Sequence, residues 1–327
     1  MSRLAPKIGR SERGFTLVEL MIALVLGLVV IGGVISVLLS NQQTYRTNQA
    51  LSQVQDGSRT AFEFLARDIR QAGLTGCGSS VPVNSVLNST AWWATWNNNT
   101  LVGYDSSQTD PAVSIGTSAN QRVAGTDSIH AIGADNDSNS LNTNPGATPA
   151  GTAFSDATTT AVFNEPTAFV ASGDIAIVCD SNQATIFQYI TGSPGNTSNA
   201  LGHAFANNAL MAKLNASDWY IGNNSLGTCS AATPLACSLF RSTISVSGGT
   251  ASAQQQEIVR GVTNMQLDFL QGGTAFVAAG SVTDWSAVTA VRVTLTVAVP
   301  TNPNNINKPE ILQRVFTNTI ALRNRVG

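Results

Sequence analysis

The stretch Gly14-Phe15-Thr16-Leu17-Val18-Glu19 opens an apolar run that continues to about Leu39. From Phe15 to Leu39 the chain has 25 residues and one charge, the carboxylate of Glu19. Because a helix rises about 1.5 Å per residue, a helix of this length crosses the ~30 Å hydrocarbon core of a bilayer. A carboxylate inside such a span costs roughly 2.5–3.5 kcal/mol on insertion scales. Glu19 is therefore a candidate functional residue.

A short basic segment precedes the apolar run. Its charges sum to +3 and come from Arg3, Lys7, Arg10, Arg13 and Glu12. Positive charge holds this end of a membrane helix in the cytoplasm, so the chain after the span is predicted to lie outside it. An ordinary secretory signal is cut after its apolar region. Here the small residue Gly14 precedes that region, and a plain signal anchor explains neither its position nor that of Glu19.

This segment, Gly-Phe-Thr-Leu-Val-Glu behind a positive leader, resembles the N-terminal signal of type IV prepilins and of type II secretion pseudopilins. The resemblance covers about the first 40 residues. It implies that residues 1–14 are a leader and that a prepilin peptidase cuts between Gly14 and Phe15 and methylates the new N-terminal Phe15. It also implies that Glu19, the fifth residue of the mature chain, pairs with the α-amino group of a neighbouring subunit in a filament.

The apolar run continues into an amphipathic segment. After a transmembrane or filament-core helix over residues 15–40, residues 41–73 are predicted to continue the same helix. Apolar side chains recur there at three- and four-residue spacing, at Leu51, Val54, Ala61, Phe62, Leu65, Ile69 and Ala72. Such spacing indicates one apolar helix face. Gly73, Gly76 and Gly78 are expected to end the helix.

The charge balance argues against a nucleic-acid partner. Charged residues are 11% of the chain, about half of the usual share. Without the leader the net charge changes from −2 to −5. Arg122 is the only lysine or arginine between Gln71 and Ala212, where nine Asp and Glu occur. Nucleic-acid binding normally needs a basic face.

Four cysteines lie beyond the predicted span, namely Cys77, Cys179, Cys229 and Cys237. The compartment predicted for them is oxidising, and an even number indicates two disulfides with three possible connectivities. The simplest has Cys229–Cys237 as a local clamp and Cys77–Cys179 as a long-range link. A zinc site is disfavoured, because no C-x-x-C occurs and neither histidine is near a cysteine in sequence.

Residues 74–327 are predicted to form a β-rich head. Strands are expected at residues 126–133, 174–179, 184–190, 217–222, 238–243, 256–270, 287–299 and 313–325, with a break at Gly261. The strands at 174–179 and 184–190 are expected to form one hairpin. The strands at 217–222 and 238–243 are expected to form another, which flanks the Cys229–Cys237 loop. In the strand at 287–299 one face carries Val291, Val293, Leu295, Val297 and Val299.

The C-terminal third resembles the PilW-type minor pilins, whose relatives are the larger minor pseudopilins of type II secretion. The resemblance is carried by Val259-Arg-Gly-Val-Thr-Asn-Met-Gln-Leu-Asp-Phe269, by Val288-Thr-Ala-Val-Arg-Val-Thr-Leu295 and by Val315-Phe-Thr-Asn-Thr-Ile-Ala-Leu-Arg-Asn-Arg325. It implies an α+β pilin-like fold, with a long N-terminal helix packed on a predominantly antiparallel β head that has a loop-rich insertion at residues 80–165.

The same resemblance implies a function. The chain would be a minor pilin that takes part in type IV pilus assembly, twitching or adhesion at the pilus tip or in its priming complex. Its partners would be other minor and major pilins and the prepilin peptidase and methyltransferase. It would first be a single-pass inner-membrane protein with a periplasmic head and later part of the extracellular pilus. A type II secretion minor pseudopilin is the alternative.

A tip adhesin whose head binds a surface ligand is a second alternative. Trp92, Trp93 and Trp96 form the cluster that motivates it, although a core or a hydrophobic lid is the favoured interpretation of these side chains. The sequence has no G-x-S-x-G, H-E-x-x-H or phosphate loop and only two histidines. The chain is therefore predicted not to be an enzyme and to bind no cofactor.

One segment has the opening spacing of a calcium loop. Oxygen-bearing side chains recur in Asp135-Asn-Asp137-Ser-Asn139, but Ser140 and Gly146 stand where such a loop needs glycine and glutamate. A solvated polar loop over residues 135–160 is the favoured interpretation. No metal site is predicted.

Overall fold

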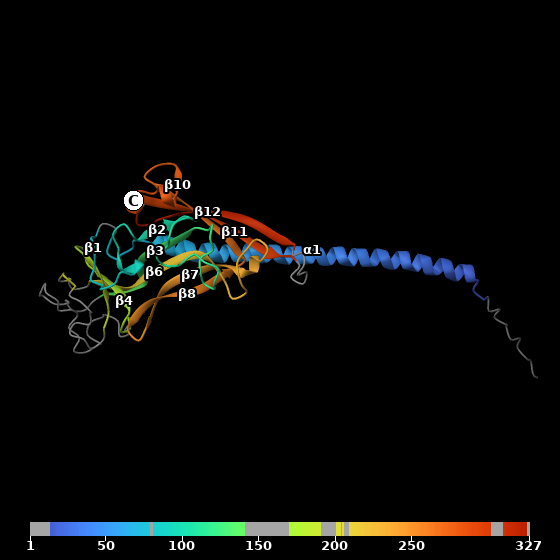
Figure 1. Ribbon diagram of the computed structural model, residues 1–327, viewed down its shortest axis with the longest axis horizontal. Helices are drawn as coiled ribbons and strands as arrows, with labels where there is room; N and C mark the ends of the chain where they lie inside the picture. Colours follow the sequence, from blue (N-terminus) through green and yellow to red (C-terminus); the bar gives the residue numbers. More distant parts are fainter. Residues whose placement is uncertain are drawn as a thin grey trace, which may run out of the picture. The chain divides into compact units, whose positions relative to one another are not determined.

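The computed structural model describes residues 14–78, 81–140, 170–190, 201–203, 205, 209–301 and 310–325. It contains one long helix, α1 (Leu17–Gln71), followed by a mostly antiparallel β head (Figure 1). This is the α+β class predicted from the sequence. The chain divides into two compact units between Gln49 and Ala50. The predicted leader up to residue 13 lies outside the described residues, as does much of the predicted loop-rich segment.

The first unit consists of α1 up to Gln49. In the described part of the chain, α1 is the one helix long and apolar enough to cross a membrane. Its large apolar side chains are at least half exposed, from 50% at Ile35 to 75% at Leu17. Such a continuous apolar surface is unfavourable in water. This part of α1 therefore needs lipid or other helices around it.

The second unit begins with the remainder of α1. Its buried residues are Ala50, Val54, Ser58, Ala61, Leu65, Ala66, Asp68 and Ile69, which follow the three- and four-residue spacing expected of one helix face. The helix ends at Gln71. Gly73 follows with a φ of +79°, in the left-handed region that favours glycine, and its N–H donates to the carbonyl of Ile132 at 2.7 Å.

The larger sheet has eight strands. Six of them lie in the order β1 (Val83–Ser85), β5 (Ala184–Gln188), β4 (Ile175–Cys179), β6 (Leu210–Asn223), β3 (Ser128–Ser140) and β2 (Leu101–Tyr104). The other two are β7 (Cys237–Ser247), which pairs with the end of β6, and β8 (Thr250–Arg260), which pairs with β7. Only β1 and β5 are parallel among these pairs. The two predicted hairpins are confirmed as β4–β5 and β6–β7.

The smaller sheet has four antiparallel strands. Their order is β10 (Phe276–Ala278), β9 (Val262–Gln271), β11 (Val288–Pro300) and β12 (Ile311–Ala321). The alternate apolar side chains of β11 are all buried, which confirms the face predicted for this strand. Gly261 separates β8 from β9 with a φ of +83°, as expected for the predicted break.

The main hydrophobic core joins the second part of α1 to both sheets. Its members include Val54 and Leu65 of α1, Trp219 of β6, Leu239 of β7 and Val293 of β11. Figure 1 shows β6, β7 and β8 beside this part of the helix. Short 3-10 turns complete the described structure, η1 (Trp92–Ala94), η2 (Pro234–Ala236), η3 (Ala279–Ser281) and η4 (Trp285–Ala287).

Several strands differ in length from the sequence expectation, and β3 and β12 are two of them. β3 continues through Asp135 to Ser140, where a polar loop was expected, because β6 is long enough to pair with it again after a register shift between Ala134 and Ser138. β12 ends at Ala321, before the expected residue 325. The chain turns there because the N–H of Leu322 donates to the carbonyl of Thr289 at 2.9 Å.

Candidate functional site

The candidate site at the N-terminus is built by the first turn of α1. Gly14, Phe15 and Thr16 precede the helix and are exposed. The N–H of Glu19 donates to Thr16 Oγ1 at 3.3 Å, which is one half of a capping box. The carboxylate of Glu19 has no hydrogen-bond or ion-pair partner among the described residues and lies in the first turn, where the helix dipole favours negative charge. The peptide bond between Gly14 and Phe15 is thus non-helical and accessible.

A buried ion pair joins α1 to the sheet of the head. Asp68 Oδ2 accepts from Arg241 Nε at 2.8 Å and from the indole Nε1 of Trp219 at 2.9 Å, and Asp68 Oδ1 accepts from Arg241 Nη2 at 3.1 Å. Only 1% of the Asp68 side chain is exposed. Three charge-assisted donors therefore fix the rotation of the helix against β6 and β7. Sequence reasoning missed this site, although a carboxylate between Leu65 and Ile69 on the apolar face was a usable signal.

A second buried charge cluster lies under β6. Arg122 is fully buried, and its guanidinium donates to the carbonyls of Asp105 at 2.7 Å and Gln108 at 3.2 Å. Burial raises the pKa of Asp110 and, together with the nearby Asp110 carboxylate, raises the pKa of Asp218 well above its usual range. No N–H or O–H group of the described residues donates to Asp218. The raised pKa favours the neutral form of the Asp218 carboxyl, which avoids a second buried negative charge beside Asp110.

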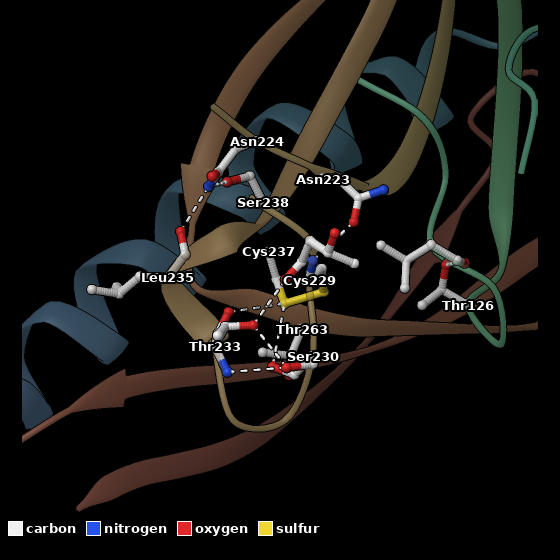
Figure 2. Close-up of a disulfide and its surroundings, with 12 residues drawn as sticks. Thr126, Asn223, Asn224, Cys229, Ser230, Thr233, Leu235, Cys237, Ser238 and Thr263 are labelled. Carbon is white, nitrogen blue, oxygen red and sulfur yellow. Dashed lines mark hydrogen bonds between the residues drawn. A yellow bond between two sulfur atoms is a disulfide. The ribbon is translucent and has the colours of Figure 1, made fainter. Parts of the chain in front are cut away.

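The head contains two disulfides, Cys77–Cys179 and Cys229–Cys237. The first links the segment after α1 to the end of β4 across 102 residues, and the second closes a loop between β6 and β7. Figure 2 shows the polar groups around the second one. Asn223 Oδ1 accepts from the N–H of Cys229 at 2.9 Å, and Asn224 Nδ2 donates to the carbonyl of Leu235 at 2.7 Å. The base of the loop is therefore held by side-chain amides as well as by sulfur.

The tryptophan cluster faces the interior. Trp92 and Trp93 are 7% and 8% exposed. Trp92 stacks on the ring of His130 at 5.2 Å between ring centroids and meets Trp93 edge to face at 5.4 Å. Burial lowers the pKa of His130 to about 4. Trp92 and Trp93 belong to the core, and Trp96 is half-buried against it. The two buried rings do not form an exposed platform for a ligand.

Among the described residues, no three His, Cys, Asp or Glu side chains come together as a possible metal site. The calcium-like segment from Asp135 lies in β3, an extended strand, up to Ser140. Gly146 of the same pattern lies outside the described residues.

Two family models match the chain. Residues 9–35 match the prokaryotic N-terminal methylation motif, and residues 218–310 match type IV pilus-assembly protein W. No curated protein matches the chain. The two matches support a PilW-type pilin that takes part in type IV pilus assembly, and such a family indicates a structural protein. The methylation motif and the apolar part of α1 fit a single-pass membrane anchor.

Proposed function

We propose that this chain is a minor pilin, made as a prepilin and assembled with other minor and major pilins at the tip or in the priming complex of a type IV pilus. The proposal rests above all on the first turn of α1. Phe15 is exposed, and Thr16 caps the helix. Glu19 lies in the first turn of an exposed apolar helix, and its carboxylate has no partner among the described residues. In this proposal residues 1–14 are the leader, residues 15–40 the filament-core helix and residues 41–73 its amphipathic continuation.

Processing creates a positive charge that can neutralise the carboxylate of Glu19. A prepilin peptidase cuts between Gly14 and Phe15 and frees an α-amino group, which is then methylated and stays positive. Phe15 and Glu19 are four residues apart, which corresponds to roughly 6 Å, about one turn, along a helix that extends to Phe15. Pairing the amine of one subunit with the carboxylate of the next neutralises both charges in an apolar environment. The same pairing sets the axial offset between neighbouring helices.

The proposed location follows from the same features. Before assembly the helix spans the inner membrane with the head in the periplasm, and afterwards the chain is part of the extracellular pilus. Two disulfides in the head suit an oxidising compartment. The match to a pilus-assembly family favours this system over type II secretion. The burial of Trp92 and Trp93 gives no support to an adhesin based on them.

Two variants test the proposal in cells. Gly14→Ala should block the cut, so that the chain keeps its leader. Glu19→Ala should be cut normally but should be missing from sheared pili, while the membrane still holds it. Glu63→Ala is the matched control, because Glu63 is another exposed carboxylate of α1 and should leave the amount in pili unchanged. Wild-type amounts of Glu19→Ala in pili would contradict the proposed role of Glu19.

A further inference from the structure

A basic cavity lies where α1 ends. It has a volume of about 610 Å³, and three arginines line it, Arg67 and Arg70 from α1 and Arg323 from the turn after β12. Gln71, Asn136 and Asn324 add side-chain amides to its wall. None of the described residues that line the cavity is acidic. Among the described residues, three positive charges therefore line one cavity and no carboxylate lines it with them.

These arginines differ from four other cations of the head. Lys213, Arg241, Arg260 and Arg292 each pair with a carboxylate. By contrast, the guanidinium groups of Arg67, Arg70 and Arg323 make no hydrogen bond or ion pair within the described structure. Arg67 only lies over the ring of Phe64, at 5.6 Å from the ring centroid. Like charges that are held together without partners repel one another, so the cavity attracts anions.

The fold fixes the backbone positions of the three arginines around the cavity. Arg67 and Arg70 stand three residues apart and so share one side of the helix. Arg323 is positioned by its neighbour Arg325, whose guanidinium donates to the carbonyl of Val288 at 3.0 Å and to Thr100 Oγ1 at 2.6 Å. Close packing at Gly73 ties the two sides together, because a Cβ there would lie 2.7 Å from Asn324 Nδ2. The fold therefore brings the three side chains to one cavity, although they come from opposite ends of the head sequence.

We propose that this cavity binds a carboxylate-rich segment of a neighbouring pilin subunit. This inference rests on the proposed function, which places other subunits beside the head. The volume lies in the 300–1,000 Å³ range of ligand pockets and exceeds what a single small oxyanion fills. Guanidinium groups bind carboxylates in a two-pronged geometry. The amides of Gln71, Asn136 and Asn324 can bind the backbone of the same segment.

A peptide-binding titration tests the site on the purified full chain in detergent. The probes are a hexaglutamate peptide, a hexaglutamine peptide and inorganic phosphate. Hexaglutamate should bind, should lose affinity steeply as salt rises, and should bind at least about tenfold more weakly to the triple variant Arg67→Gln, Arg70→Gln, Arg323→Gln, since three charge-assisted pairs are lost. Hexaglutamine should not bind.

A charge-matched variant provides the control. The triple variant Arg46→Gln, Arg59→Gln, Arg314→Gln removes three exposed arginines that do not line the cavity, and it should bind hexaglutamate within about twofold of the wild type. Equal losses in both triple variants would overturn the site, because net charge alone would then explain binding. Phosphate binding without hexaglutamate binding would overturn the peptide assignment.

The cellular experiment separates this inference from the proposed function. The cavity variant should be cut before Phe15 like the wild type, yet its amount in sheared pili should fall several-fold. If it enters pili in wild-type amounts, the cavity does not contact a neighbouring subunit. If the wild-type chain itself is not cut or does not enter pili, the proposed function fails, while the titration still reports on the cavity.

Discussion

Removing the carboxylate of Asp68 is expected to destabilise the head by about 3–5 kcal/mol, the usual cost of breaking a buried ion pair. Asp68→Ala leaves the guanidinium of Arg241 without its two bonds to Asp68 and leaves the indole N–H of Trp219 without an acceptor. Both groups are largely buried, with 16% of the Arg241 side chain exposed. Each unpaired donor retains its cost of desolvation, which is the main part of the expected loss.

The chain offers a matched control for this prediction. Asp268 and Arg292 make the same kind of pair, with Nη2 and Oδ2 2.8 Å apart, but their side chains are 38% and 41% exposed. Solvent screens such a pair, so Asp268→Ala should cost at most about 1 kcal/mol. The two pairs share the same residue types and the same shortest distance, so the comparison reports on burial together with the additional hydrogen bond from Trp219.

Urea unfolding of the full chain in mild detergent measures both variants. Tryptophan fluorescence and circular dichroism should report one transition with an unchanged slope and a shifted midpoint. The double variant Asp68→Leu, Arg241→Met should recover a large part of the loss, because it leaves no buried charge unpaired. Equal costs for Asp68→Ala and Asp268→Ala would refute the reasoning that burial of the first pair fixes α1 to the head.

Further predictions concern the same unfolding assay. Asp218→Asn should stabilise the head more at pH 8 than at pH 5. The pKa of Asp218 is raised in the folded state, so folding of the wild type becomes less favourable as the pH rises above the ordinary pKa of an aspartate. An equal effect of the substitution at both pH values would contradict a raised pKa. The pKa of His130 is about 4 in the folded state against 6.5 in the unfolded chain, so the unfolded chain binds a proton first as the pH falls. The free energy of unfolding should therefore drop by about 3 kcal/mol between pH 6.5 and pH 4, and His130→Gln should not show this drop. Gly133→Ala should cost roughly 1–3 kcal/mol, because its Cβ would overlap the last carbonyl of α1; a neutral effect would mean that the helix end moves freely. Replacing Cys77 and Cys179 by serine should cost about 4–5 kcal/mol, since it opens a loop spanning 102 residues, and a cost below about 1 kcal/mol would show that the loop is already constrained.

The elements that sequence predicted well are those with a local signal. The apolar run after Phe15 and the spacing of Val54, Ala61 and Leu65 predicted both parts of α1, because burial on one helix face repeats every three or four residues. Alternation predicted the face of β11 in the same way. The hairpins followed from two strands that a short turn separates.

The elements that sequence missed depend on contacts between distant residues. The parallel pair β1–β5 joins Val83 to Ala184, and no local pattern selects that partner. Asp68 meets Arg241 from 173 residues away. The periodicity of either segment reports only which face is buried. A charge on a buried face signals that a partner exists, but the fold decides which residue it is.

The same distinction between local and long-range signals applies to the functional residues. Glu19 stood out from the sequence alone, because a single carboxylate in an apolar span is costly wherever the rest of the chain lies. The cavity formed by Arg67, Arg70 and Arg323 did not, because its third arginine comes from the far end of the chain.

The central claim is that this chain is processed into a pilin whose first residue is Phe15. The most direct test is mass analysis of the N-terminal peptide of the chain recovered from cells. We predict a peptide that begins at Phe15 and carries one added methyl group. A recovered chain that still begins before Gly14, or that is cut after the apolar run beyond Leu39, would contradict the account.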